Sequence, residues 1–170
     1  TGFSAFIGIA YTQAKLPDQF VVDDAHAFVG FDAYQKVIQS GVDVVVIACT
    51  SHFHPVFLKA AIDAGKHVFV EKPVAVDPAG VRVAMAASEE AKKKNLSIVS
   101  GFCWRYDRGV SETIQRIRDG AIGDIVAVQG TRLGGSYVLR TRRPEWNEMQ
   151  YQFQNWYHFN WLSGSDPVQN

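Results

Sequence analysis

The sequence contains little of what defines several specialised classes of protein. Its 170 residues include two cysteines, Cys49 and Cys103, which are too few for a disulfide framework. Positive and negative side chains balance at 17 each, so charge gives no case for a nucleic-acid or anionic-membrane partner. No apolar run approaches the ~20 residues that a membrane-spanning helix needs. These absences leave a globular protein, which the 47% of hydrophobic residues also favours.

Histidine and cysteine spacing gives no sign of a metal site. His26, His67 and His158 stand at no metal-ligand spacing from either cysteine, so we expect no metal. Cys49 and Cys103 each end an apolar, strand-like run. We therefore expect both thiols to be buried and unreactive.

Short helices alternate with apolar strands between about residues 34 and 120. The β-branched run over residues 43–49 predicts a strand that is buried on both faces of a parallel sheet. Further strands are expected over residues 67–70 and 96–103, and helices over 34–40, 55–64, 77–95 and up to Gly120. This alternation is typical of an α/β fold with a doubly wound parallel sheet.

The pattern changes after Gly123. Residues 125–131 predict a longer strand, and residues 149–161 predict a helix rich in aromatic side chains. An arginine-rich stretch near residue 140 is expected to be a mobile, solvated loop, or else a contact to an acidic substrate or another subunit. We place a domain boundary near residue 122.

Polar side chains follow each of the three predicted strands. In a doubly wound sheet, ligands bind outside the carboxyl ends of the strands, so these side chains should converge on one crevice. They are Thr50, Ser51 and His54 after the first strand, Glu71, Lys72 and Pro73 after the second, and Trp104 and Arg105 after the third.

Several segments resemble one oxidoreductase family. Residues 65–73, with the sequence GKHVFVEKP, resemble the signature of the glucose-fructose oxidoreductase, inositol dehydrogenase and MocA family (Gfo/Idh/MocA). Residues 47–51 and His54 are similar to its first cofactor-contacting loop, and residues 120–125 to its crossing into a second domain. Residues 155–164 look like a bacterial subgroup. A Glu-Lys-Pro triplet alone would be weak evidence for the family, but the order of these segments along the chain makes the resemblance specific.

The resemblance implies hydride transfer between NAD or NADP and a hydroxyl or keto carbon of a sugar or polyol. It makes residues 1–122 the second part of a Rossmann sheet and residues 123–170 the beginning of a carboxy-terminal α/β domain. In the family that domain has an open sheet, which covers the substrate and often makes oligomer contacts, so a homo-oligomer is expected.

Two family features are missing from the sequence. There is no Gly-x-Gly-x-x-Gly loop to cradle the pyrophosphate, and no residue that reads the ribose 2′ position. We expect both to lie upstream of Thr1, and the family's second-domain histidine to lie just beyond Asn170, which makes the chain an internal piece. The sequence is compatible with a bacterial protein that stays in the cytoplasm and with one that is exported.

Lys72 is the expected catalytic residue. Its ammonium could stabilise a substrate oxyanion or relay the hydroxyl proton, whereas the alternative is a lysine at a strand end on the surface. Glu71 could pair with Lys72 or hold the nicotinamide ribose. Pro73 keeps Lys72 extended, and the Lys72–Pro73 bond is hypothesised to be cis.

The other candidates each have a structural alternative. Thr50, Ser51 and His54 could contact the cofactor or cap the helix at Pro55. The resemblance places Arg105 beside the nicotinamide and the substrate, and Trp104 beside the substrate. The alternative is that Arg105 lies over a helix surface and that Trp104 packs in the core. Tyr157, at helical spacing in the aromatic stretch, could line the substrate or pack in a domain interface.

Two further functions compete with the enzyme. A non-catalytic nucleotide-binding or sensor protein could keep the fold, because fold does not fix activity. A structural assembly protein could use the second-domain sheet as an interface. Retention of Glu71, Lys72 and Pro73 and the polar strand ends favour the oxidoreductase.

Overall fold

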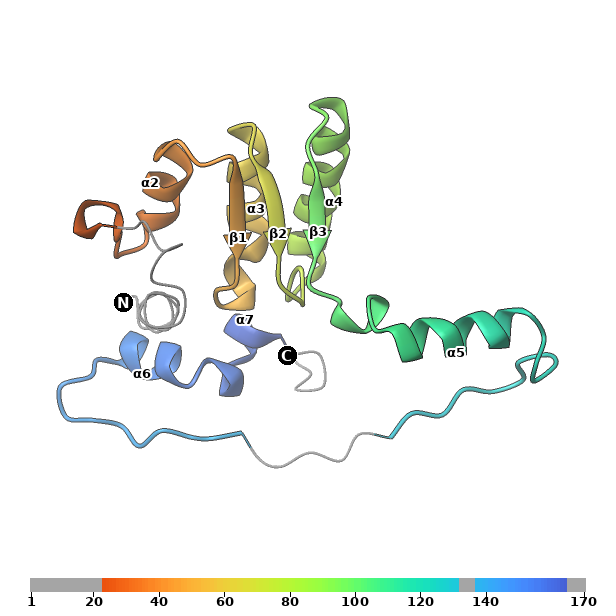
Figure 1. Ribbon diagram of the computed structural model, residues 1–170. Coiled ribbons are helices and arrows are strands. Elements are labelled where there is room, and N and C mark those ends of the chain that lie inside the picture. The colour runs from red at the N-terminus through yellow and green to blue at the C-terminus, as the bar shows by residue number, and fades with distance from the viewer. Residues whose placement is uncertain (1–22, 132–136, 165–170) are drawn as a thin grey trace.

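A parallel three-stranded sheet forms the centre of the protein. The computed structural model describes residues 23–131 and 137–164 (Figure 1). Its strands are β1 (Val44–Ile47), β2 (His67–Val70) and β3 (Ile98–Ser100), in that order across the sheet. Val45 is in register with Val68, and Val68 with Ile98. The predicted α/β fold is confirmed.

Two helices cover one face of the sheet (Figure 1). They are α3 (His54–Asp63), which packs on β1 and β2, and α4 (Pro78–Lys93), which packs on α3. A shorter helix, α2 (Ala33–Gln39), contacts α3 and follows the single turn η2 (Asp24–His26). The core is therefore the layer between the sheet and α3 and α4, where Leu58, Ile62 and Val70 are almost fully buried.

The expectation that the first strand is buried on both faces is wrong for the described residues. Val45 and Ile47 face α3 and are buried, whereas Val44 is 55% and Val46 is 67% exposed. Alternate residues of a strand point to opposite faces, and helices cover only one face among the described residues. A β-branched run therefore predicted the strand but not how many of its faces are covered.

The helix α5 (Arg108–Arg118) extends away from this layer (Figure 1). It follows the turn η4 (Cys103–Arg105) and buries none of its residues, although its apolar residues lie on one side. Beyond it, the strand predicted over residues 125–131 is absent, because the backbone there makes no ladder with any described residue. Val126 is 95% exposed. The boundary near residue 122 stays a prediction.

The aromatic stretch is helical, as predicted, but in three pieces. These are α6 (Glu148–Gln154), η5 (Trp156–His158) and α7 (Asn160–Ser163). They return to the tip of β1, where η3 (Ser51–Phe53) follows the strand. Phe153 stacks on Phe53 with ring centroids 5.9 Å apart, and Trp161 meets His52 edge to face at 5.4 Å. None of the described helices has the length and apolar character to cross a membrane.

The arginine-rich stretch is exposed to solvent, as expected, and is also held by specific contacts. Arg142 pairs with Glu148, which lowers the pKa of that carboxyl, and its guanidinium lies 4.3 Å from the centroid of the Tyr151 ring. The buried Asn155 binds the backbone of Arg140 twice. The Arg140 amide donates to Asn155 Oδ1 at 2.7 Å, and Asn155 Nδ2 donates to the Arg140 carbonyl oxygen at 3.2 Å. These polar contacts, and not the burial of apolar side chains, hold the stretch in place.

Candidate functional site

The carboxyl ends of the three strands lie side by side. The ladder of backbone hydrogen bonds continues one residue past the ends of β2 and β3, because the amide of Glu71 donates to Ile47 O at 2.8 Å and that of Gly101 donates to Val70 O at 2.9 Å. The loops that carry the predicted site residues therefore start from one aligned edge. This alignment follows from the parallel topology of the βαβ units.

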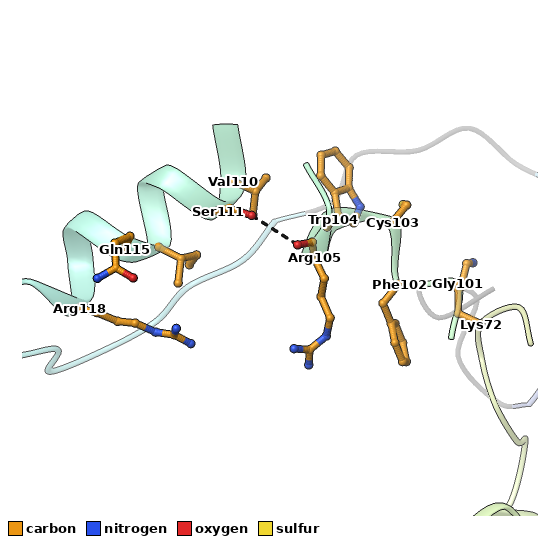
Figure 2. Close-up of a pocket in the computed structure, with 11 residues that line it drawn as sticks. Lys72, Gly101, Phe102, Cys103, Trp104, Arg105, Val110, Ser111, Gln115 and Arg118 are labelled. Carbon is orange, nitrogen blue, oxygen red and sulfur yellow. Dashed lines mark hydrogen bonds between the residues drawn. The ribbon is translucent and has the colours of Figure 1, made fainter. Parts of the chain in front are cut away.

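Lys72 is one of the residues that line a pocket beside this edge (Figure 2). The pocket has a volume of about 700 Å³ and is lined by Lys72, by residues 101–105 and by one side of α5. The Lys72–Pro73 peptide bond is cis, which confirms that hypothesis. Lys72 and Arg105, from the tips of β2 and β3, thus share one cavity, and no acidic residue lines it among the described part of the chain.

Trp104 and Arg105 occupy the turn η4 on the pocket side. Trp104 is 70% exposed, so it is not a core residue, and the Arg105 guanidinium carbon lies 6.0 Å from the centroid of the Phe102 ring. Cys103 is exposed in the same turn, which corrects the expectation that it is buried. Cys49 is as expected, because burial raises the pKa of its thiol to about 12.

His54 joins two of the loops from within the protein. It is 1% exposed, its Nδ1 lies 2.7 Å from Pro73 O, and its Nε2 lies 3.0 Å from Cys49 O. Both ring nitrogens therefore face backbone carbonyls. The ring connects the loop after β1 to the loop that carries Lys72, a role that differs from the cofactor contact and the helix cap weighed from the sequence.

Thr50, Ser51 and Tyr157 do not line the pocket. Thr50 stands at the N-cap of η3 without a side-chain cap bond, and Ser51 is buried behind it. Tyr157 stacks between Tyr137, at 4.6 Å, and Trp156, at 3.9 Å, and partial burial, with Tyr137 adding to it, raises the pKa of its phenol. The structure therefore brings Lys72, Trp104 and Arg105 together and leaves these three residues elsewhere.

Sequence reasoning missed the part of the pocket that α5 contributes. Ser111, Gln115 and Arg118 line it, and Ser111 Oγ donates to Arg105 O at 3.3 Å. A signal was present, because these residues recur at helical spacing on one side of a predicted helix. What the sequence does not contain is the direction in which that helix leaves η4.

A parallel α/β layer with polar loops at its carboxyl ends defines a protein of the nucleotide-binding Rossmann class. Residues 5–101, more than half of the chain, match the GFO_IDH_MocA model, described as an oxidoreductase family with an NAD-binding Rossmann fold. The chain belongs to the Gfo/Idh/MocA family, which confirms the resemblance seen in its motifs.

Curated relatives of the chain include inositol dehydrogenases. Inositol 2-dehydrogenase of Salmonella typhimurium is 32% identical over 114 residues, which cover 67% of this chain and 33% of the relative. The scyllo-inositol 2-dehydrogenase (NAD(+)) of Bacillus subtilis is 30% identical over 99 residues, which cover 58% of this chain and 28% of the relative. The chain thus spans about one third of the length of these relatives.

Solved structures of the same class resemble the fold. The apo scyllo-inositol dehydrogenase of Lactobacillus casei gives a TM-score of 0.51 at 27% identity, over 68% of this chain and 32% of that one. The aldose-aldose oxidoreductase of Caulobacter crescentus, complexed with glycerol, gives 0.51 at 28% identity, over 66% of this chain and 33% of that one.

Proposed function

We propose that the full-length gene product is an NAD- or NADP-dependent oxidoreductase that interconverts a hydroxyl and a keto carbon of a sugar or polyol. The observation that carries the proposal is that Lys72 and Arg105, from neighbouring strand ends, line one pocket of about 700 Å³. Family membership and the inositol dehydrogenases among the relatives support it. The proposal concerns the whole protein, because the part matched by this chain covers about one third of the relatives' length.

The described residues fit the nicotinamide end of the cofactor. The pocket opens at the carboxyl ends of β2 and β3, where dinucleotides lie in sheets of this kind. Thr50, on the loop after β1, is the residue we assign to the cofactor's ribose or phosphate oxygens, and Glu71, after β2, is the one we assign to its nicotinamide ribose. The buried Ser51 and His54 support these loops from within the protein. When it is bound, the nicotinamide accepts or gives the hydride.

Lys72 acts on the oxygen of the reacting hydroxyl and on its proton. An ammonium beside the reacting hydroxyl donates a hydrogen bond to its oxygen and stabilises the negative charge that develops as hydride leaves. In the neutral form the same amine can take the hydroxyl proton and pass it to solvent. Arg105, which lines the same pocket, is positioned to hold a second oxygen of the substrate.

The pocket walls suit a polyhydroxylated substrate. Ser111 and Gln115 present a hydroxyl and an amide, and Trp104 presents an exposed ring face. A sugar or polyol has hydroxyl groups for the first two and C–H faces for the third. Polar groups beside aromatic and aliphatic side chains, here Phe102, Val110 and Ile114, are typical of small-molecule sites.

We further propose that the protein is a homo-oligomer that uses its carboxy-terminal region. The valines Val126 and Val128, two residues apart and almost fully exposed, support this, because neighbouring apolar side chains left in solvent are typical of an interface. Light scattering of the full-length protein tests it, and a monomer at micromolar concentration would refute it.

The test of function is a turnover assay on the full-length protein. We expect NAD or NADP reduction with at least one member of a panel of inositols, aldoses and acyclic polyols. Lys72→Ala should lower kcat by about 10² to 10⁴-fold, the range of a lost general acid–base group, with cofactor affinity changed much less. Lys59→Ala, which removes an exposed lysine paired with Asp63, should leave kcat unchanged.

The competing functions give different results. A protein that binds NADH but turns over no substrate of the panel is the non-catalytic sensor, and our proposal is then wrong. A Lys72→Ala variant that keeps wild-type kcat would also reject the assigned role of this lysine.

A further inference from the structure

Gly101 stands where the carboxylate of Glu71 comes closest to the tip of β3. A Cβ atom built on Gly101 would lie 2.5 Å from Glu71 Oε2, 2.7 Å from its Cδ and 2.8 Å from its Oε1. Real Cβ atoms do not approach other heavy atoms so closely, and the three nearest atoms belong to this one carboxylate. The carboxylate thus fills the space that any side chain at position 101 would need.

The same carboxylate is fixed to the backbone of the proposed catalytic residue. The amide of Lys72 donates to Glu71 Oε2 at 3.1 Å. Gly101 and Lys72 both line the pocket, and Gly101 is joined to β2 through its bond to Val70 O. The Glu71 side chain therefore lies across the tips of β2 and β3, between the glycine and the backbone of Lys72.

Backbone geometry does not explain the glycine. Six described glycines have a positive φ, a conformation that favours glycine, and Gly101 is not one of them. Gly130 also lacks a positive φ, and a Cβ there would meet nothing within 4 Å. Gly101 differs from Gly130 in having the Glu71 carboxylate next to it. A glycine is therefore required at position 101 because a larger residue would collide with that carboxylate.

We propose that Gly101 is a positioning residue for the oxidoreductase reaction. By lacking a side chain it lets the Glu71 carboxylate settle against the tip of β3, where that carboxylate holds the backbone of Lys72 and sets its side chain at the pocket. The inference rests on the proposed function for its catalytic consequence, while the Gly101–Glu71–Lys72 linkage rests on the geometry alone.

The linkage predicts how an alanine at this position would act. The Glu71 side chain is flexible at its far end, so Gly101→Ala should displace the carboxylate rather than unfold the protein. The Lys72 amide then loses its acceptor, and the lysine loses its fixed backbone. Misplacing a catalytic group by about 1 Å can cost on the order of 10²-fold in rate, so the expected loss is in kcat and not in stability.

A double-mutant cycle in the full-length protein tests the inference. The variants are Gly101→Ala, Glu71→Ala and the two combined, with Gly130→Ala as the matched control. We expect Gly101→Ala and Glu71→Ala each to lower kcat by about tenfold or more, and the combined variant to be no slower than the slower single one. The melting temperature and the kcat of Gly130→Ala should stay at the wild-type values.

A second measurement does not depend on activity. The exchange rate and the ¹⁵N shift of the Lys72 amide report the bond to Glu71 directly. We expect Gly101→Ala and Glu71→Ala to change both alike, with no change in Gly130→Ala. If wild-type protein has no turnover but the amide responds in this way, the proposed function fails and the linkage stands.

Two results would overturn the inference. One is multiplication of the two single-variant losses in the combined variant, which would mean that Gly101 and Glu71 act independently. The other is a Lys72 amide that is unchanged in Gly101→Ala, or a loss of activity that only accompanies a lowered melting temperature. Either would make Gly101 a structural residue without a link to Lys72.

Discussion

The strand layer, residues 44–100, and the outer segment, residues 101–164, use the same kinds of residue with opposite results. Val45 and Val68 are buried in the strand layer, whereas Val126 and Val128 are almost fully exposed in the outer segment. Both pairs come from β-branched runs. The two regions differ in whether a neighbouring strand is present. β1 pairs with β2, whereas residues 125–131 pair with no strand among the described residues. A sequence run supplies the propensity, but pairing and coverage decide burial.

The helices of the two regions differ in the same way. Both α4 and α5 begin at an aspartate cap, and both carry an apolar side. The small residues Ala84, Ala87 and Ala91 of α4 are buried against α3 and the sheet, whereas no residue of α5 is buried. Helical periodicity therefore identified each helix, but it did not reveal whether a partner surface was present.

The largest expected difference between the regions is in cysteine reactivity. Because burial raises the pKa of Cys49 to about 12, roughly one Cys49 thiol in ten thousand is ionised at pH 8. Cys103 is exposed on the pocket wall. N-ethylmaleimide at pH 8 should therefore modify Cys103 and leave Cys49 intact, as peptide mass spectrometry can show.

The control for this labelling is Cys103→Ser, which should take up no reagent in the native state and one equivalent at Cys49 after denaturation. Modification of Cys49 in the folded protein would show that the strand layer opens more readily than its burial indicates. The comparison between the two regions would then have to be given up.

Much of the strand layer could be predicted from the sequence, because its signals are local. The run over residues 43–49, the helix starting at Pro55 and the turn at Gly65 all lie in one βαβ unit, so periodicity and caps determine them. The convergence of Lys72 with Arg105 was also predictable, since parallel strands end at one edge. The outer segment was less predictable, because the contacts of η4 and α5 depend on chain direction and not on periodicity.

Individual site residues show the same limit. The position of Lys72 followed from the strand that precedes it, but the closeness of Glu71 to Gly101 depends on side-chain geometry between two strands far apart in sequence. The two carbonyl contacts of His54 also join distant loops and could not be read from local spacing.

Stability should respond strongly in the strand layer and weakly outside it. Ile62 is fully buried between the sheet and α4, so Ile62→Ala should lower the free energy of unfolding by about 3 kcal/mol through lost contacts and a cavity. The same substitution at the exposed Ile125 should change it by less than about 0.5 kcal/mol. Urea denaturation measures both. Equal losses would mean that residues 125–131 are packed in solution.

Removing the helix caps should separate global from local stability. Asp77 Oδ1 accepts from Gly80 N at 2.6 Å in α4, and Asp107 Oδ1 accepts from Val110 N at 2.8 Å in α5. Asp77→Ala should cost about 1 kcal/mol of global stability, because α4 is part of the packed layer. Asp107→Ala should instead leave the unfolding midpoint unchanged and speed amide exchange within α5 alone.

The matched variants for the caps are Asp77→Asn and Asp107→Asn, which keep a side-chain acceptor and should behave nearly as wild type. A drop in the global midpoint for Asp107→Ala as large as that for Asp77→Ala would show that α5 unfolds together with the strand layer. The two helices would then form one cooperative unit.

The smallest effect concerns two buried serines and should have opposite signs in the two regions. Ser100 Oγ is buried at the end of β3 and has no hydrogen-bond partner among the described residues, whereas Ser163 Oγ, also buried, lies 2.9 Å from Gly164 O and 3.3 Å from Phe159 O. Ser100→Ala removes an unpaired polar atom and should raise the free energy of unfolding by about 1 kcal/mol. Ser163→Ala removes the hydroxyl that donates to Gly164 O and should lower it by about 1 kcal/mol. Both changes delete a single oxygen, so denaturation curves compare them directly, and a loss of stability in Ser100→Ala would reveal a partner for that hydroxyl in solution.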